Sequence, residues 1–134
     1  MAKESGIPLT VSLDDSTPAA QDISGDVTNA DWSTPRGVQD VTGVNAAAME
    51  RLLLLADLQA TLNGAFNDAS NQAHDVLKTV PSTSVTRTLS ITISGQVLAE
   101  EVIVTDYALA RAQDGGLTWT APCLLNQATA PAWA

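Results

Sequence analysis

The chain has 134 residues with 15 acidic and 6 basic side chains, a net charge of −9. The length fits one domain, and the acidic balance with scattered basic residues excludes binding nucleic acid by neutralising phosphates. A single cysteine, Cys123, cannot form an intrachain disulfide and is expected to be a small core or interface residue. No apolar run reaches the ~18 residues of a membrane span and no signal-peptide core is present, so neither secretion by that route nor a membrane anchor is expected.

The first third of the chain predicts short strands. The segments "LTVSLDD" (9–15), "DVTNADWSTP" (26–35) and "GVQDVTG" (37–43) are β-like and are separated by proline and glycine. We expect them to be the first strands of one sheet system.

The middle of the chain carries mixed signals. Alanine, methionine, glutamate, arginine and leucine favour a helix in 45–55, whereas residues 56–66 alternate apolar and polar positions as in a strand. We therefore predict a short helix that begins at the cap Asn45 and ends at Leu55, followed by a strand from Ala56 to Phe66. A second short helix is predicted with Ser70 as its N-cap, ending before Pro81.

The last third predicts three consecutive antiparallel strands. "TRTLSITI" alternates, Gly95 supplies a hairpin turn, and an apolar strand then runs to about Ala110. The turn at 113–116 leads into "LTWTAPCLL", where Leu117, Trp119, Ala121 and Cys123 share a face. Pro122 predicts that this last strand lies at an edge or contains a bulge.

The predicted fold class follows from this pattern of strands. It is mainly β, an antiparallel β-sandwich or barrel-like sheet with one or two short flanking α-helices. A single domain is expected to span residues 1–134, with flexible segments at about 1–7 and about 126–134.

No arrangement of residues in the sequence predicts catalysis. Any Ser-His-Asp or Cys-His site would have to include His74, the only histidine, which lies in a predicted helix without a nucleophile motif. Spaced aspartates of a calcium loop and phosphate-binding glycine loops are also missing. We expect no enzyme activity, no catalytic residues, no metal site and no cofactor.

The stretch "VLAEEVIVTDY" (97–107) places three carboxylates in an apolar run. Neighbouring strand residues point to opposite faces, so Glu100 and Glu101 cannot enter one cleft. Glu100 and Asp106 share a face, but six residues of ~3.3 Å separate them by about 20 Å, more than the ~5–9.5 Å between paired glycosidase carboxylates. Both faces mix apolar and acidic residues, which predicts that one meets the core and the other a second subunit. The alternative is a central strand with a helix on its second face and a bulge near the two glutamates.

The order of several motifs resembles the tail tube (major tail) proteins of long-tailed bacteriophages of the siphophage type. "DVTNADWST", "QDVTG", "LADLQATLNGAFN" and "AHDVLKT" follow one another as similar segments do in that family. "EEVIVTDYALARAQDGGLTWTAPCLL" and the closing "APAW" are similar as well, so the resemblance covers about Leu9 to Trp133. The leucine run Leu52–Leu55 departs from the family pattern.

The resemblance implies a subunit of the virion tail that is made and assembled in the bacterial cytoplasm. Such subunits form hexameric rings, which stack into a tube whose lumen conducts DNA during ejection without binding it specifically. The implied partners are further copies of the chain and other tail proteins: the tape measure, the tail terminator and the distal tail or baseplate. An acidic lumen would repel DNA phosphates.

Candidate residues for the two surfaces follow from the predicted elements. The lumen candidates stand on predicted strands: Asp31, Asp57, Glu100 and Asp106. The inter-subunit contact candidates include exposed apolar residues and arginines able to pair with a neighbour's carboxylates: Arg36, Met49, Arg51, Leu52 and Leu53.

Two other functions fit the sequence. A monomeric β-sandwich that binds carbohydrate or mediates adhesion could use Trp32, Trp119 and Trp133 as a stacking platform, although Trp119 shares the apolar phase of its strand. The inner tube of a phage-like injection machine would share the fold but conduct protein or drive a spike.

Overall fold

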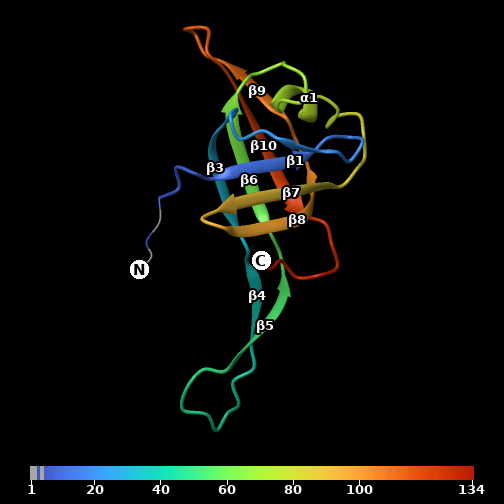
Figure 1. Ribbon diagram of the computed structural model, residues 1–134. Coiled ribbons are helices and arrows are strands. Elements are labelled where there is room, and N and C mark those ends of the chain that lie inside the picture. Colours follow the sequence, from blue (N-terminus) through green and yellow to red (C-terminus); the bar gives the residue numbers. More distant parts are fainter. Residues whose placement is uncertain (1–2, 4) are drawn as a thin grey trace.

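The computed structural model describes residue 3 and residues 5–134, and the described chain forms an open, two-layered antiparallel β structure. Eight strands belong to one sheet in the order β2-β1-β7-β8-β10-β6-β3, with β9 pairing β10, and β4 and β5 form a separate pair. The strands are β1 (Thr10–Asp14), β2 (Ala20–Asp22), β3 (Val27–Ser33), β4 (Arg36–Asp40), β5 (Arg51–Ala56), β6 (Gln59–Ala65), β7 (Arg87–Ile93), β8 (Gln96–Val104), β9 (Ala108–Arg111) and β10 (Leu117–Leu125), and the helix is α1 (Ala73–Leu77). Figure 1 shows β1, β7 and β8 crossing β3, β6 and β10. The predicted fold class is confirmed, without closure into a barrel.

The core lies between these two crossing layers. Alternate residues of each strand point into it, as the sequence periodicity predicts for strands with one buried face. On β10 the buried residues are Trp119, Ala121 and Cys123, so the core role predicted for Cys123 is confirmed. The helix contributes Ala73, Val76 and Leu77. No helix in the described part of the chain is long and apolar enough to cross a membrane.

The turn between β7 and β8 is the hairpin that the sequence predicts. Its two central residues, Ser94 and Gly95, have φ values of 51° and 78°. Positive φ at both positions is the geometry whose twist matches that of the flanking strands. The pairing then runs without a shift from Ile93 opposite Gln96 to Arg87 opposite Val102, so there is no bulge at the two glutamates.

The strand predicted to run to Ala110 is broken after Val104, and β9 begins at Ala108. Pro122 explains where the break falls. Its carbonyl accepts a hydrogen bond from the Thr105 amide, so the proline nitrogen also faces the gap between β8 and β9. Because Pro122 has no N–H group, its position at this gap means that no hydrogen bond between neighbouring strands is lost. The prediction of an edge strand is wrong, since β10 is paired on both sides and the irregularity lies in its partner.

The helix predicted from Asn45 to Leu55 is wrong. Residues 51–56 form β5, which pairs with β4 in a two-stranded ribbon that continues β3 and β6 beyond the body of the molecule. We call residues 36–56 the arm; it extends at the bottom of Figure 1. Helix propensities differ by only fractions of a kcal/mol per residue, and strand pairing with β4 overrides them. The following strand is confirmed as β6.

The helix near His74 is confirmed, but its predicted cap is wrong. α1 begins after Gln72, which makes no capping hydrogen bond with its side chain. The cap instead comes from a distant residue, because Asp26 accepts a hydrogen bond from the Ala73 amide at 3.0 Å with one oxygen. Its other oxygen accepts one from the Asn67 side chain at 2.8 Å. Residues 47 positions apart cannot be paired from local sequence patterns.

Gly64 on β6 is closely approached by its neighbours in the same layer, Trp119 on β10 and the Asp26 backbone just before β3. A methyl group there would lie 2.0 Å from the Asp26 carbonyl oxygen and 2.6 Å from the Trp119 ring. The same indole donates a hydrogen bond to the Ala65 carbonyl at 2.9 Å. The glycine therefore lets the largest buried side chain lie flat against the sheet.

We predict that Gly64→Ala destabilises the fold by about 1–3 kcal/mol or more, because neither the backbone oxygen nor the packed indole can move aside. Urea unfolding of the two proteins measures the difference. Gly25→Ala is the control, since a methyl group there meets nothing within 4 Å, and should change stability by less than about 0.5 kcal/mol. Equal midpoints for all three proteins would contradict the packing described.

Candidate functional site

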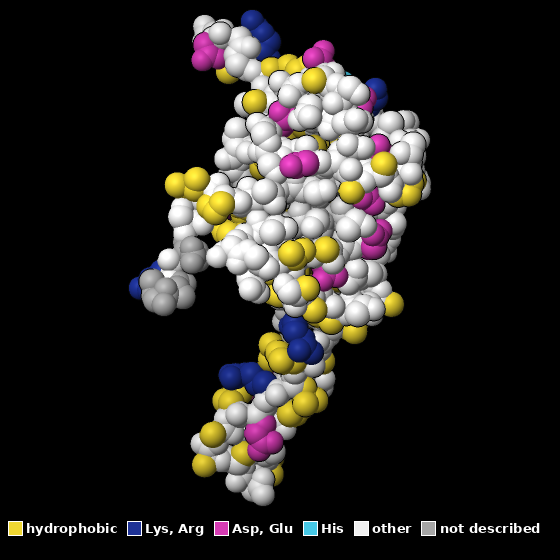
Figure 2. Space-filling model, in the orientation of Figure 1, with side chains coloured by type: hydrophobic (Ala, Val, Ile, Leu, Met, Phe, Trp, Pro, Cys, Tyr) yellow, Lys and Arg dark blue, Asp and Glu magenta, His cyan; other side chains and the backbone are white. Residues whose placement is uncertain are grey.

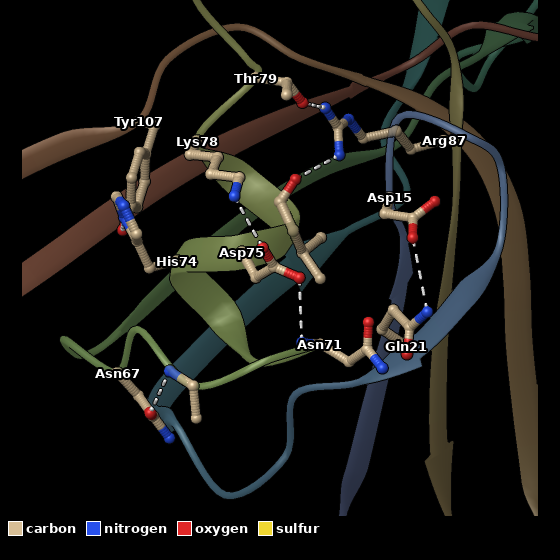
Figure 3. Close-up of polar contacts among 12 residues, drawn as sticks. Asp15, Gln21, Asn67, Asn71, His74, Asp75, Lys78, Thr79, Arg87 and Tyr107 are labelled. Carbon is tan, nitrogen blue, oxygen red and sulfur yellow. Dashed lines mark hydrogen bonds and ion pairs between the residues drawn. The ribbon is translucent and has the colours of Figure 1, made fainter.

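His74 makes packing contacts and not the contacts of a catalytic base. Its Nδ1 lies 3.0 Å from the Tyr107 hydroxyl, and its ring centroid lies 4.8 Å from that of Phe66. Figure 3 shows the imidazole beside Tyr107, at the outer side of α1. Burial raises the pKa of Tyr107 and raises the pKa of the Cys123 thiol to about 12, which keeps that thiol protonated. The contacts among His74, Phe66 and Tyr107 hold α1 next to the break between β8 and β9.

The carboxylates near α1 are satisfied by nearby donors. Asp75 accepts a hydrogen bond from the Asn71 amide and pairs with Lys78 at 2.8 Å, and the bond from Lys78 lowers its pKa (Figure 3). Hydrogen bonds from Thr17 and Ala19 lower the pKa of Asp15 to about 2. Among the described residues, no three His, Cys, Asp or Glu side chains are grouped so as to hold a metal ion. These acids stabilise turns and the helix.

Arg87 is a buried cation that joins three elements. Its guanidinium donates to the carbonyls of Asp14 and Val76 at 3.0 and 2.8 Å and to the Thr79 hydroxyl at 3.0 Å. Burial lowers its pKa. The contacts link β1, β7 and the end of α1, so this charge has a structural role.

Glu100 and Glu101 point to opposite sides of β8. Glu100 is only 7% exposed, and its carboxylate accepts hydrogen bonds from the Ala132 amide at 2.8 Å and from the Gln127 side chain. Glu101 is half-buried and accepts a hydrogen bond from the Thr88 hydroxyl. In the isolated chain, therefore, Glu100 does not present a charge at the surface.

The C-terminal segment, residues 126–134, lies along the part of β8 that β10 leaves unpaired. Val97 and Ala134 exchange backbone hydrogen bonds at 3.1 and 2.8 Å, and Trp133 lies opposite Leu98. Gln127 fixes the other end of the segment through Glu100 and the Glu101 amide. No local sequence pattern indicates this role of Gln127. The flexibility predicted for both ends of the chain remains a prediction, and residues 1, 2 and 4 lie outside the described part.

The outer surface of β3, β6, β10 and β9 is polar; we call it the polar face. Across it the Thr120 hydroxyl donates to Asn63 at 2.8 Å and the Asn29 amide to Asp31 at 3.3 Å. Strand register places these outward residues on it: Asn29, Asp31, Ser33, Gln59, Thr61, Asn63, Ala65, Ala108, Ala110, Thr118, Thr120, Pro122 and Leu124. The polar phase of β6 is visible in the sequence, but its alignment with β3 and β10 requires the register.

The other acidic candidates border the polar face. Asp31 is exposed on it. Asp57 precedes β6, is half-buried and accepts hydrogen bonds from the Leu58 amide at 2.8 Å and the Gln59 side chain at 3.5 Å. Asp106 is exposed in the break between β8 and β9 and accepts a bond from the Tyr107 amide. No lysine or arginine occurs among the thirteen outward residues named above.

The arm gathers the five predicted contact residues: Arg36, Met49, Arg51, Leu52 and Leu53. All five are exposed, as are Val38, Leu54 and Leu55 on the same ribbon. Figure 2 shows hydrophobic side chains along the arm and basic ones near its junction with the body. The leucine run in the sequence indicates an apolar segment. Because the run was interpreted as a helix, the pairing of Leu53 with Val38 on β4 could not be expected.

Two of the three tryptophans are unsuited to a sugar-stacking platform. Trp119 is buried in the core, and Trp32 is partly buried against it. Trp133 is exposed, and it belongs to the C-terminal segment beside β8. The three rings therefore do not share an exposed surface.

Solved structures share this fold over almost the whole chain. A chain in the virion of a native gene transfer agent particle superposes with a TM-score of 0.78 at 16% identity, covering 97% of this chain and 99% of that one. A chain in the tail of an empty gene transfer agent particle, with C6 symmetry, gives 0.79 at 15% identity and 98% coverage of both. A chain of the phage p2 baseplate gives 0.53 at 12% identity, covering 92% of this chain and 45% of that one. No protein-family profile and no curated protein matches the sequence. The fold implied by the resemblance to tail tube proteins is confirmed.

We predict that Glu100→Ala loosens the C-terminal segment. The substitution removes the acceptor of the Ala132 amide and of Gln127, and hydrogen bonds to a charged group contribute about 1.5–3 kcal/mol. Amide hydrogen exchange at residues 132 and 134 should become faster by at least tenfold. Glu101→Ala is the matched control, because the Glu101 carboxylate accepts its hydrogen bond from Thr88 and not from the segment. Unchanged exchange in Glu100→Ala would show that other contacts hold the segment.

Proposed function

We propose that the chain is a structural subunit of a phage-type tail tube, built from stacked hexameric rings. The carrying observation is the superposition, over nearly its full length, on a chain from a tail with C6 symmetry. The fold itself leaves a large apolar surface uncovered, which supports a role in assembly.

The arm supports assembly most directly. A two-stranded ribbon is marginally stable in water unless a hydrophobic face is covered. Here the exposed fractions are 52% for Leu52, 61% for Leu53, 44% for Leu54 and 90% for Leu55. Contiguous exposed apolar side chains mark contacts with other molecules. The arm is therefore proposed to pack on neighbouring subunits.

The two ends of the molecule favour stacking in one direction. The arm projects at one end, and the hairpin of β9 and β10 projects at the opposite end (Figure 1). That hairpin also exposes leucines, Leu109 and Leu117. Contacts between unlike surfaces repeat without limit along an axis, whereas contacts between like surfaces close a dimer. Apolar residues at opposite ends thus suit a growing tube.

The polar face is proposed to line the lumen. It carries mostly hydroxyl, amide and small side chains with Asp31, together with Pro122 and Leu124, and Asp57 and Asp106 lie at its border. Such a surface offers no cation for DNA phosphates to bind, so DNA can slide past it. The strands at its two sides, β3 and β9, each have one edge that no described strand pairs, and neighbouring subunits can extend the sheet there. Glu100 is left out of the lining because it is buried.

The remaining parts of the proposal follow from a position in the tube. The subunit would contact the tape measure inside the tube, the tail terminator at one end and the distal tail or baseplate at the other. It would be assembled in the bacterial cytoplasm and end in the virion tail.

We predict that removing this chain from the particles that contain it yields particles without tails, because no other subunit would build the tube. Negative-stain microscopy after deletion counts tailed and tailless particles. Expression of the chain in trans should restore tails. Tails of normal length and width in the deletion would contradict the proposed function.

We predict that Asp31→Lys slows DNA release several-fold while tubes still assemble. The change places a cation in every subunit of the lumen, and phosphates would bind it transiently. Release is measured by the fluorescence of a DNA dye after triggering. Asp68→Lys, in an exposed loop away from the polar face, changes the charge equally and should leave release unchanged. The same rate in both variants would remove Asp31 from the lining.

A further inference from the structure

Two glycines of the chain directly follow an asparagine or an aspartate, in the pairs Asn63–Gly64 and Asp114–Gly115. In such a pair the glycine nitrogen can attack the side-chain carbonyl carbon of the preceding residue, because glycine has no side chain that hinders the approach. The attack also needs a backbone that can bend, as at an exposed loop tip. The structure places the two pairs in opposite surroundings.

Asn63–Gly64 is held within a strand that is paired on both sides. β6 pairs with β3 and with β10, and both pairings include these two residues. The Asn63 side-chain oxygen accepts a hydrogen bond from the Thr120 hydroxyl at 2.8 Å, and a methyl group on Gly64 would lie 2.6 Å from the Trp119 ring. The attack would require the Asn63 side chain to leave Thr120 and the backbone to leave its extended conformation, so the sheet protects this pair.

Asp114–Gly115 lies in the turn between β9 and β10, at the end of the molecule opposite the arm (Figure 1). Residues 112–117 are all exposed. Gly115 has a φ of 97°, in the left-handed region that glycine adopts without steric hindrance. This pair therefore has the exposure and the backbone freedom that Asn63–Gly64 lacks.

The hydrogen bonds of the turn hold the reacting groups near each other. Asp114 Oδ1 accepts a hydrogen bond from the Gly116 amide at 2.9 Å, so the carboxyl group is folded back along the peptide bonds that follow it. The same N–H stabilises the negative charge that collects on Oδ1 when the Gly115 nitrogen attacks the Asp114 Cγ atom. The Gly115 N–H donates to the Ala112 carbonyl at 2.9 Å, a bond within the exposed turn that opens when the tip frays.

We propose that Asp114–Gly115 is a site of spontaneous isoaspartate formation and that the fold prevents the corresponding reaction at Asn63–Gly64. The Gly115 nitrogen forms a bond to the Asp114 Cγ atom, and the carboxyl hydroxyl leaves as water with the amide proton. Water then adds to one of the two carbonyl groups of the resulting succinimide ring. Breaking the bond between nitrogen and Cγ restores aspartate, whereas breaking the bond between nitrogen and the main-chain carbonyl carbon gives isoaspartate. Water is the only molecule released and consumed. Isoaspartate adds a methylene group to the main chain of the turn.

Ageing of the purified, folded chain tests the proposal. After several weeks of incubation, a protein isoaspartyl methyltransferase with a labelled methyl donor marks isoaspartate, and mass spectrometry of peptides locates it. The peptide that contains residue 114 should become labelled steadily, and the peptide that contains residue 63 should react at least about tenfold more slowly, because its reaction requires strand pairs to open.

Two variants of Asp114 identify the reacting group. Asp114→Glu keeps the charge but would have to close a larger ring, so label should disappear from this peptide. Asp114→Asn should react faster than the wild type, because an amide is attacked more readily than an ionised carboxylate, and the peptide should show the mass change of an amide that becomes an acid.

Ageing in guanidinium chloride separates the effect of the fold from that of the sequence. In the unfolded chain Asn63–Gly64 should react at least as fast as Asp114–Gly115, because the strands that restrain it are gone. The proposal is overturned if the folded chain shows no label at residue 114, reacts equally fast at both pairs, or keeps its label at this turn in Asp114→Glu.

Discussion

The pairing of β10 on both of its edges determines how the rest of the chain is arranged. β6 covers one edge along seven residue pairs, whereas β9 and then β8 share the other edge and change over at Pro122. This change lets one continuous strand belong to both crossing layers. Trp119, Ala121 and Cys123 on its inner side fill the space between the layers, and Gly64 leaves room for the indole. The outer side of the same strand and of β6 forms the polar face.

The same arrangement leaves the arm without support inside the subunit. β3 and β6 continue directly into β4 and β5, which pair only with each other among the described residues and leave their leucines exposed. The chain therefore separates three surfaces in space: a packed core, a mostly polar face and an apolar arm, and under the proposed function the last two would face DNA and other copies. Charge follows this division, since the arm is neutral and the body is acidic. The titratable groups described above stabilise turns, the helix and the C-terminal segment.

The sequence predicts those parts of the fold that depend on local periodicity. The strands joined by the hairpin at Gly95, the strand β10 and the strand β6 each have one buried face. The alternation of apolar and polar residues in the sequence predicts these strands. Residues 45–55 of the arm are predicted as a helix because leucine, alanine and methionine favour helices locally, whereas the strand β5 forms by pairing with β4, which is a separate segment. Asp26 as the helix cap and Gln127 as the anchor of the C-terminal segment depend on contacts between distant residues. Burial of Glu100 could not be predicted for the same reason, although its separation from Glu101 followed from strand geometry. The two glutamates are therefore one internal anchor and one outer residue.

A cryo-electron microscopy map of the tail of particles containing this chain tests the central claim most directly. The account predicts six copies per ring, with the polar face toward the lumen and each arm leaving its own ring to contact copies in the next. Density in which β3, β6, β10 and β9 face the exterior, or in which the arm folds back on its own subunit, would contradict it.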